Sequence, residues 1–122
     1  MIDDHFRARI VLISALGSEG NAPEPPLGMG VLLSDTLVLT CAHVVAKATE
    51  HDPFDRDRPP RGVIVRLAIA RRGDDGVANA TVAENGWFPK QSVRAHDEPA
   101  DIALLVLARG QLMTGAVPPL SL

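Results

Sequence analysis

The chain has 122 residues, a length that favours one domain over residues 1–122 with a hydrophobic core that needs no metal or disulfide. Its 46% hydrophobic and 22% charged residues are ordinary for a globular protein and exclude an intrinsically disordered chain. The formal net charge of −3 gives no general attraction to polyanions, so we expect neither nucleic acid nor a membrane as a partner.

Short apolar segments rich in Ile, Val and Leu dominate the first half of the chain. Residues 9–16 form the first of them, and a loop with three prolines follows at 17–26. Two more β-prone runs, 27–33 and 37–41, are separated by S-D-T at 34–36, which predicts a hairpin.

The second half continues this pattern. Proline-rich, charged residues 50–61 predict a surface loop, and hydrophobic residues then alternate over 63–70, as in a strand with one buried face. Turn residues at 71–76 lead to another strand over 77–83. The continuous apolar run at 102–107 predicts a strand that is buried on both faces or closes a barrel.

Helical character is confined to residues 42–49. Six short strands with turn-rich connections and almost no helix predict an all-β domain, most simply a small barrel.

The compartment is suggested by three features. The single cysteine, Cys41, cannot form an internal disulfide, which favours a reducing environment. The apolar run at 102–108 is too short to span a bilayer. Residues 1–4, M-I-D-D, place acidic groups where a secretory signal needs positive charge. We therefore expect a cytoplasmic protein.

His43 differs from the other histidines by its position. His5, His51 and His96 fall in polar or charged segments, which predicts solvated loop side chains. His43 directly follows an apolar strand and has small neighbours, so the fold can hold it rigidly. A half-buried structural histidine also fits this position.

Asp101 immediately precedes the apolar run at 102–107. A carboxylate at the start of a buried strand is costly unless it is hydrogen-bonded, although an aspartate facing water is the simpler interpretation of this residue alone. If Asp101 meets His43, it fixes one imidazole nitrogen and leaves the other as a base. Such a pair predicts a nitrogen–oxygen distance of about 2.6–3.2 Å.

Two segments resemble a known family. G-M-G-V-L-L-S-D at 28–35 followed by L-V-L-T-C-A-H at 37–43 is similar to the histidine region of trypsin-like serine peptidases. D-I-A-L-L at 101–105 is similar to the motif that carries their triad aspartate. The two motifs also occur in the His-then-Asp order of that family.

The resemblance implies a six-stranded antiparallel Greek-key β-barrel, the N-terminal half of a trypsin-like double barrel, with its core over residues 6–116. V-P-P-L within 117–122 resembles the start of the linker to the second barrel. By the same resemblance, His43 is the general base, Asp101 orients it, and the substrate is a polypeptide.

The chain also departs from the family. The nucleophile motif G-D-S-G-G is absent, and none of the serines has the glycine neighbours of an oxyanion hole. Val44 stands where secreted members often carry a disulfide-bonded cysteine, which favours an intracellular member. We expect the serine to come from a second barrel and this chain alone to hydrolyse nothing.

Other sites are less well supported. Cys41, His43, His51 and Asp52 have residue types that zinc accepts, but no second pair follows at structural-zinc spacing, so we expect no metal and no other cofactor. We expect Cys41 to be a small buried cysteine whose side chain does not meet that of His43 at hydrogen-bond distance.

Three remaining features have structural interpretations. The glycines at 28 and 30 lack the rest of a dinucleotide fingerprint and predict close backbone approach in a barrel strand. W-F-P at 87–89 predicts a core plug under the barrel end, and the arginines of 56–72 are interleaved with acids as solvated loop charges.

Two functions remain open. The chain is either the N-terminal half of a serine endopeptidase or a complete, non-catalytic half-peptidase that acts as a binding or scaffolding module. In either case an apolar barrel face near His43 should be exposed, and we expect a second barrel or a homodimer to cover it.

Overall fold

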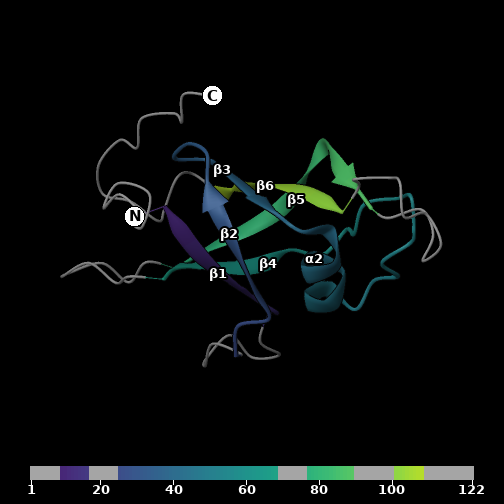
Figure 1. Ribbon diagram of the computed structural model, residues 1–122, viewed down its shortest axis with the longest axis horizontal. Coiled ribbons are helices and arrows are strands. Elements are labelled where there is room, and N and C mark those ends of the chain that lie inside the picture. The colour runs from purple at the N-terminus through teal and green to yellow at the C-terminus, as the bar shows by residue number, and fades with distance from the viewer. Residues whose placement is uncertain (1–8, 17–24, 69–76, 90–100, 109–122) are drawn as a thin grey trace.

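The computed structural model describes residues 9–16, 25–68, 77–89 and 101–108, in which six antiparallel strands form a closed barrel (Figure 1). The elements are β1 (Ile10–Ser14), β2 (Gly28–Leu32), β3 (Leu37–Thr40), α2 (Ala42–Thr49), β4 (Val63–Leu67), β5 (Val77–Phe88) and β6 (Ile102–Leu107). Their order around the barrel, β1-β2-β3-β6-β5-β4, is a Greek key. The predicted all-β fold class is confirmed.

Alternating side chains of the strands fill the barrel. In β4, Val63, Val65 and Leu67 are buried, as their period of two predicts. The prediction that residues 102–107 are buried on both faces is wrong, because β6 is an ordinary barrel strand with one inner face. Its outward side chains Ile102 and Val106 are 41% and 42% exposed. The alternative that this strand closes the barrel is confirmed by its pairing with both β3 and β5.

The glycines of β2 allow close packing, as predicted. A Cβ on Gly28 would lie 2.6 Å from the side chain of Val44 in α2, and one on Gly30 would lie 2.9 Å from the carbonyl oxygen of Leu39. These contacts bring β2 against both β3 and the first turn of α2. The corner between β3 and α2 is therefore tightly packed against β2.

β5 is longer than the sequence indicates. The expected strand ended at residue 83, but β5 continues to Phe88 through a register shift between Val82 and Trp87, and the ribbon bends sharply there (Figure 1). The irregular pairing at 83–86 interrupts the hydrophobic alternation by which strands are predicted. Trp87 is buried in the hydrophobic core, as expected, but within the strand.

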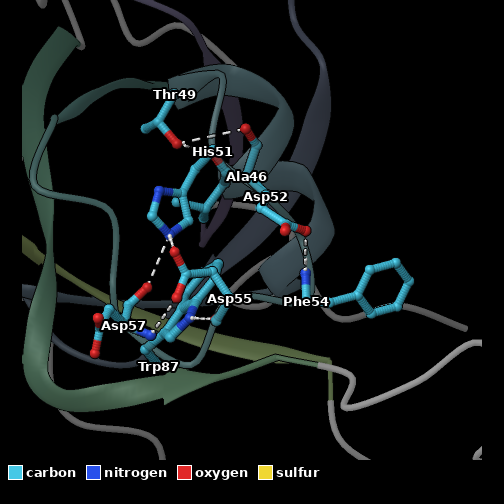
Figure 2. Close-up of polar contacts among 9 residues, drawn as sticks. Ala46, Thr49, His51, Asp52, Phe54, Asp55, Asp57 and Trp87 are labelled. Carbon is cyan, nitrogen blue, oxygen red and sulfur yellow. Dashed lines mark hydrogen bonds and ion pairs between the residues drawn. The ribbon is translucent and has the colours of Figure 1, made fainter.

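The loop after α2 holds His51, which is not the solvated side chain we predicted. Its Nε2 donates to the carbonyl oxygen of Asp57 at 2.8 Å and lies 3.4 Å from a carboxylate oxygen of Asp55 (Figure 2). The ring meets Trp87 edge-on, with 6.0 Å between centroids. The indole Nε1 in turn donates to the carbonyl oxygen of Asp55 at 2.8 Å. His51 thus ties the loop to the end of the barrel.

Several predictions concern parts of the chain outside the described residues. They include His5, His96, the turn at 71–76 and the linker at 117–122. Among the helices that the structure describes, none is long and apolar enough to cross a membrane.

Candidate active site

The site lies at the corner where β3 ends and α2 begins. β3 ends at Thr40, Cys41 is the extended N-cap residue with φ −87° and ψ 140°, and the helix starts at Ala42. Val44 and Val45 are buried, and the Thr40 hydroxyl donates to the carbonyl oxygen of Met29 at 2.8 Å. These contacts hold the first turn of α2 in place while the side chain of His43 stays on the surface.

Asp101 reaches this corner from the start of β6. The pairing of Thr40 with Ala103 aligns β6 beside β3, so that Asp101 lies next to the N-terminus of α2. Its N–H donates to the carbonyl oxygen of Phe88 at 2.9 Å. Its φ of 136° is a conformation that residues with side chains rarely adopt, and this local strain occurs at the residue that faces His43.

Both carboxylate oxygens of Asp101 are hydrogen-bonded to His43. Oδ2 lies 2.6 Å from the ring Nδ1, and Oδ1 accepts the main-chain N–H of His43 at 2.9 Å. The main-chain oxygen of Asp101 also accepts the N–H of Ala42 at 3.2 Å. Cys41 makes no side-chain cap bond, so Asp101 caps the first turn of α2 from another strand.

The contact expected between His43 and Asp101 is therefore present. A carboxylate acceptor at Nδ1 assigns the ring proton to that nitrogen and leaves Nε2 as a proton acceptor. The His43 side chain is 61% exposed and that of Asp101 only 19% exposed. The arrangement thus exposes most of the imidazole to solvent and keeps the carboxylate that holds it on the sheltered side.

Cys41 is exposed, not buried as predicted. Its sulfur lies near the pair, since the ligand atoms of Cys41, His43 and Asp101 are all within 4.8 Å of one another, although the described contacts include no hydrogen bond between Cys41 and His43. The sequence did not reveal this because the extended N-cap residue turns the chain between strand and helix, where neither periodicity predicts side-chain direction. His51 and Asp52, the other residues considered for zinc, lie beyond the opposite end of α2.

An apolar hollow of about 470 Å³ adjoins the pair. Met29, Leu39 and Ile102 line it together with Cys41 and Asp101. These three apolar side chains are 59%, 37% and 41% exposed. The polar corner is therefore bordered by a concave apolar surface, the general character of a binding or packing site.

The described serines do not complete a triad. Ser14 is 3% exposed inside β1, and Ser34 lies in the β2–β3 turn, where its hydroxyl is 3.4 Å from that of Thr36. Within the part of the chain that the structure describes, neither forms a hydrogen bond with His43.

Comparison with known proteins supports the fold. No family model and no curated protein matches the sequence. Among solved structures, the chain is similar to the Drosophila clip serine protease Grass of the Toll pathway, with a TM-score of 0.51 and 19% sequence identity. The match covers 100% of this chain but only 34% of the protease chain. The likeness shows a trypsin-like barrel and extends over about a third of that protease.

Proposed function

We propose that this chain is the His–Asp barrel of a serine endopeptidase. The observation that carries the proposal is the 2.6 Å contact of His43 Nδ1 with Asp101 Oδ2 on a trypsin-like barrel. A structural histidine needs no free ring nitrogen in solvent, whereas a general base does. The exposed ring of His43 meets that requirement.

The residues have distinct roles in the proposed reaction. His43 Nε2 takes the proton from a serine hydroxyl as the serine oxygen attacks the peptide carbonyl, and then gives that proton to the leaving amine. Asp101 holds the ring by Nδ1 and stabilises the imidazolium that forms between these steps. The serine and the oxyanion hole come from a second barrel, so the chain by itself is expected to hydrolyse no peptide bond.

The same proposal accounts for the apolar hollow beside the pair. Met29, Leu39 and Ile102 are large hydrophobic side chains exposed in a hollow that Asp101 also lines. A second barrel packed on this surface would bury them and bring its serine to Nε2. If the chain instead acts alone as a non-catalytic binding module, a second copy is the simplest cover for this surface, and light scattering would then show a dimer.

The test begins with the coding sequence beyond Leu122, where we expect a second barrel with a nucleophilic serine between glycines. The encoded protein should react with a fluorophosphonate, which labels activated serines. Replacing His43 by Ala should abolish labelling. Asp101→Asn should also lower labelling. Asp35→Asn is its matched control, because Asp35 is an exposed aspartate of the β2–β3 turn, and should leave labelling unchanged. A stop codon after Leu122, or labelling that persists without His43, would refute the proposal.

A further inference from the structure

We propose that Cys41, His43 and Asp101 form a binding site for a zinc-like divalent cation. The ligand atoms that they offer all lie within 4.8 Å of one another. Thiolate sulfur, imidazole nitrogen and carboxylate oxygen are the ligands that zinc uses in proteins. This set differs from the one considered from the sequence, because Asp101 takes the place of His51 and Asp52.

The three donors are positioned before any ion arrives. Cys41 and His43 flank the first residue of α2, and Asp101 is fixed to that turn by the His43 N–H at 2.9 Å and the Ala42 N–H at 3.2 Å. A cation would therefore order few new groups on binding. Such preorganisation favours affinity, because the conformational cost of assembling the site is already met by the fold.

Charge and access also suit a dication. A Cys41 thiolate and the Asp101 carboxylate together neutralise two positive charges. Cys41 and His43 are exposed, so an ion can enter from solvent and keep a water in the remaining position, as in zinc sites with three protein ligands. The apolar hollow that Cys41 and Asp101 also line borders the site.

Binding would change the His43–Asp101 pair. Two ligand atoms on one tetrahedral ion stand roughly 3.3 Å apart for bonds of about 2.0–2.1 Å, whereas Nδ1 and Oδ2 are 2.6 Å apart. We infer that the ion takes the place of the proton between them. The S–H bond of Cys41 breaks and releases a proton to solvent, the imidazole proton moves from Nδ1 to Nε2, and sulfur, nitrogen and oxygen each bond to the metal.

The bound ion would thereby disable the base. With its proton on Nε2, His43 cannot accept another proton from a nucleophile. This consequence for catalysis rests on the proposed function. The binding itself does not depend on peptidase chemistry and is measurable on this chain alone, in which Cys41 and His43 are exposed.

The experiment is a Co²⁺ titration of the folded 122-residue chain, followed by displacement with Zn²⁺. Thiolate-to-cobalt charge transfer absorbs in the near ultraviolet, and Cys41 is the only cysteine that can produce it. We expect a saturable band at one ion per chain. Cys41→Ala should abolish the band, and because Cys41 makes no cap bond this variant should fold normally. His43→Ala and Asp101→Asn should weaken binding by at least about 10–100-fold, the loss usual even for residues that only support a ligand, whereas Asp35→Asn should not weaken it.

Three results would overturn the site. If His43→Ala and Asp101→Asn bound the ion as tightly as the natural chain does, the thiol of Cys41 would bind it alone. A stoichiometry of one ion to two chains would mean that the ion bridges molecules. Persistence of the His43 Nδ1 proton resonance in the Zn²⁺-saturated chain would exclude Nδ1 as a ligand.

Discussion

The two ends of α2 each place a histidine beside a carboxylate, and the two pairs differ in almost every other respect. At the N-terminal end, the His43 side chain is 61% exposed and its ring is held by Asp101 at 2.6 Å. At the C-terminal end, the His51 side chain is 17% exposed and its Nε2 is occupied by the carbonyl oxygen of Asp57. Proximity of a histidine to an acid therefore does not define a reactive site. What distinguishes His43 is that most of its ring is exposed while one ring nitrogen is held by a carboxylate.

Activity should distinguish the two histidines most strongly. In the complete protein that we propose, His43→Ala should lower kcat on the order of 10⁴-fold or more, because no other group can take the serine proton. His51→Gln should change kcat far less, since His51 lies at the other end of α2. Steady-state hydrolysis of a peptide substrate measures both. If the two variants lose activity equally, the distinction between the two ends of α2 fails.

For stability we expect the opposite order, with His51 contributing more than His43. His51→Ala removes the hydrogen bond to Asp57 and the edge contact with Trp87, so we expect it to lower the free energy of unfolding by about 2–3 kcal/mol. His43→Ala removes an exposed side chain and should cost much less. Urea denaturation of this chain followed by Trp87 fluorescence measures both changes. If His43→Ala lowered the free energy of unfolding more than His51→Ala, the structural role would belong to His43 and the prediction would be wrong.

These contrasts also show which parts of the molecule can be predicted from the sequence. The strands, the helix at 42–49 and the meeting of His43 with Asp101 could be predicted because they follow from hydrophobic periodicity and two strand-end motifs. The extension of β5 to Phe88 could not be predicted, since the irregular residues 83–86 separate the two paired parts of the strand. The partial burial of His51 and the exposure of Cys41 depend on how a loop and a strand–helix corner fold. Tertiary contacts decide both, and local pattern carries no signal for them.

A smaller change in stability is expected at Asp101, which is hydrogen-bonded to both the ring of His43 and the start of α2. Asp101→Ala removes the acceptor for the His43 N–H and should cost about 1 kcal/mol of unfolding free energy, the usual effect of losing a helix cap. Asp101→Asn keeps an oxygen for that N–H and should recover most of the loss in urea denaturation.

The same substitution should not restore catalysis in the complete protein. In Asp101→Asn, the introduced amide would turn its NH₂ toward Nδ1, so the ring would carry its proton on Nε2 and could not act as the base. This variant should therefore fold nearly as well as the natural chain and still lose kcat on the order of 10⁴-fold. If kcat instead changed in parallel with the free energy of unfolding across the natural chain, Asp101→Asn and Asp101→Ala, Asp101 would be a helix cap alone. The pair at the N-terminus of α2 would then be as structural as the pair at its other end.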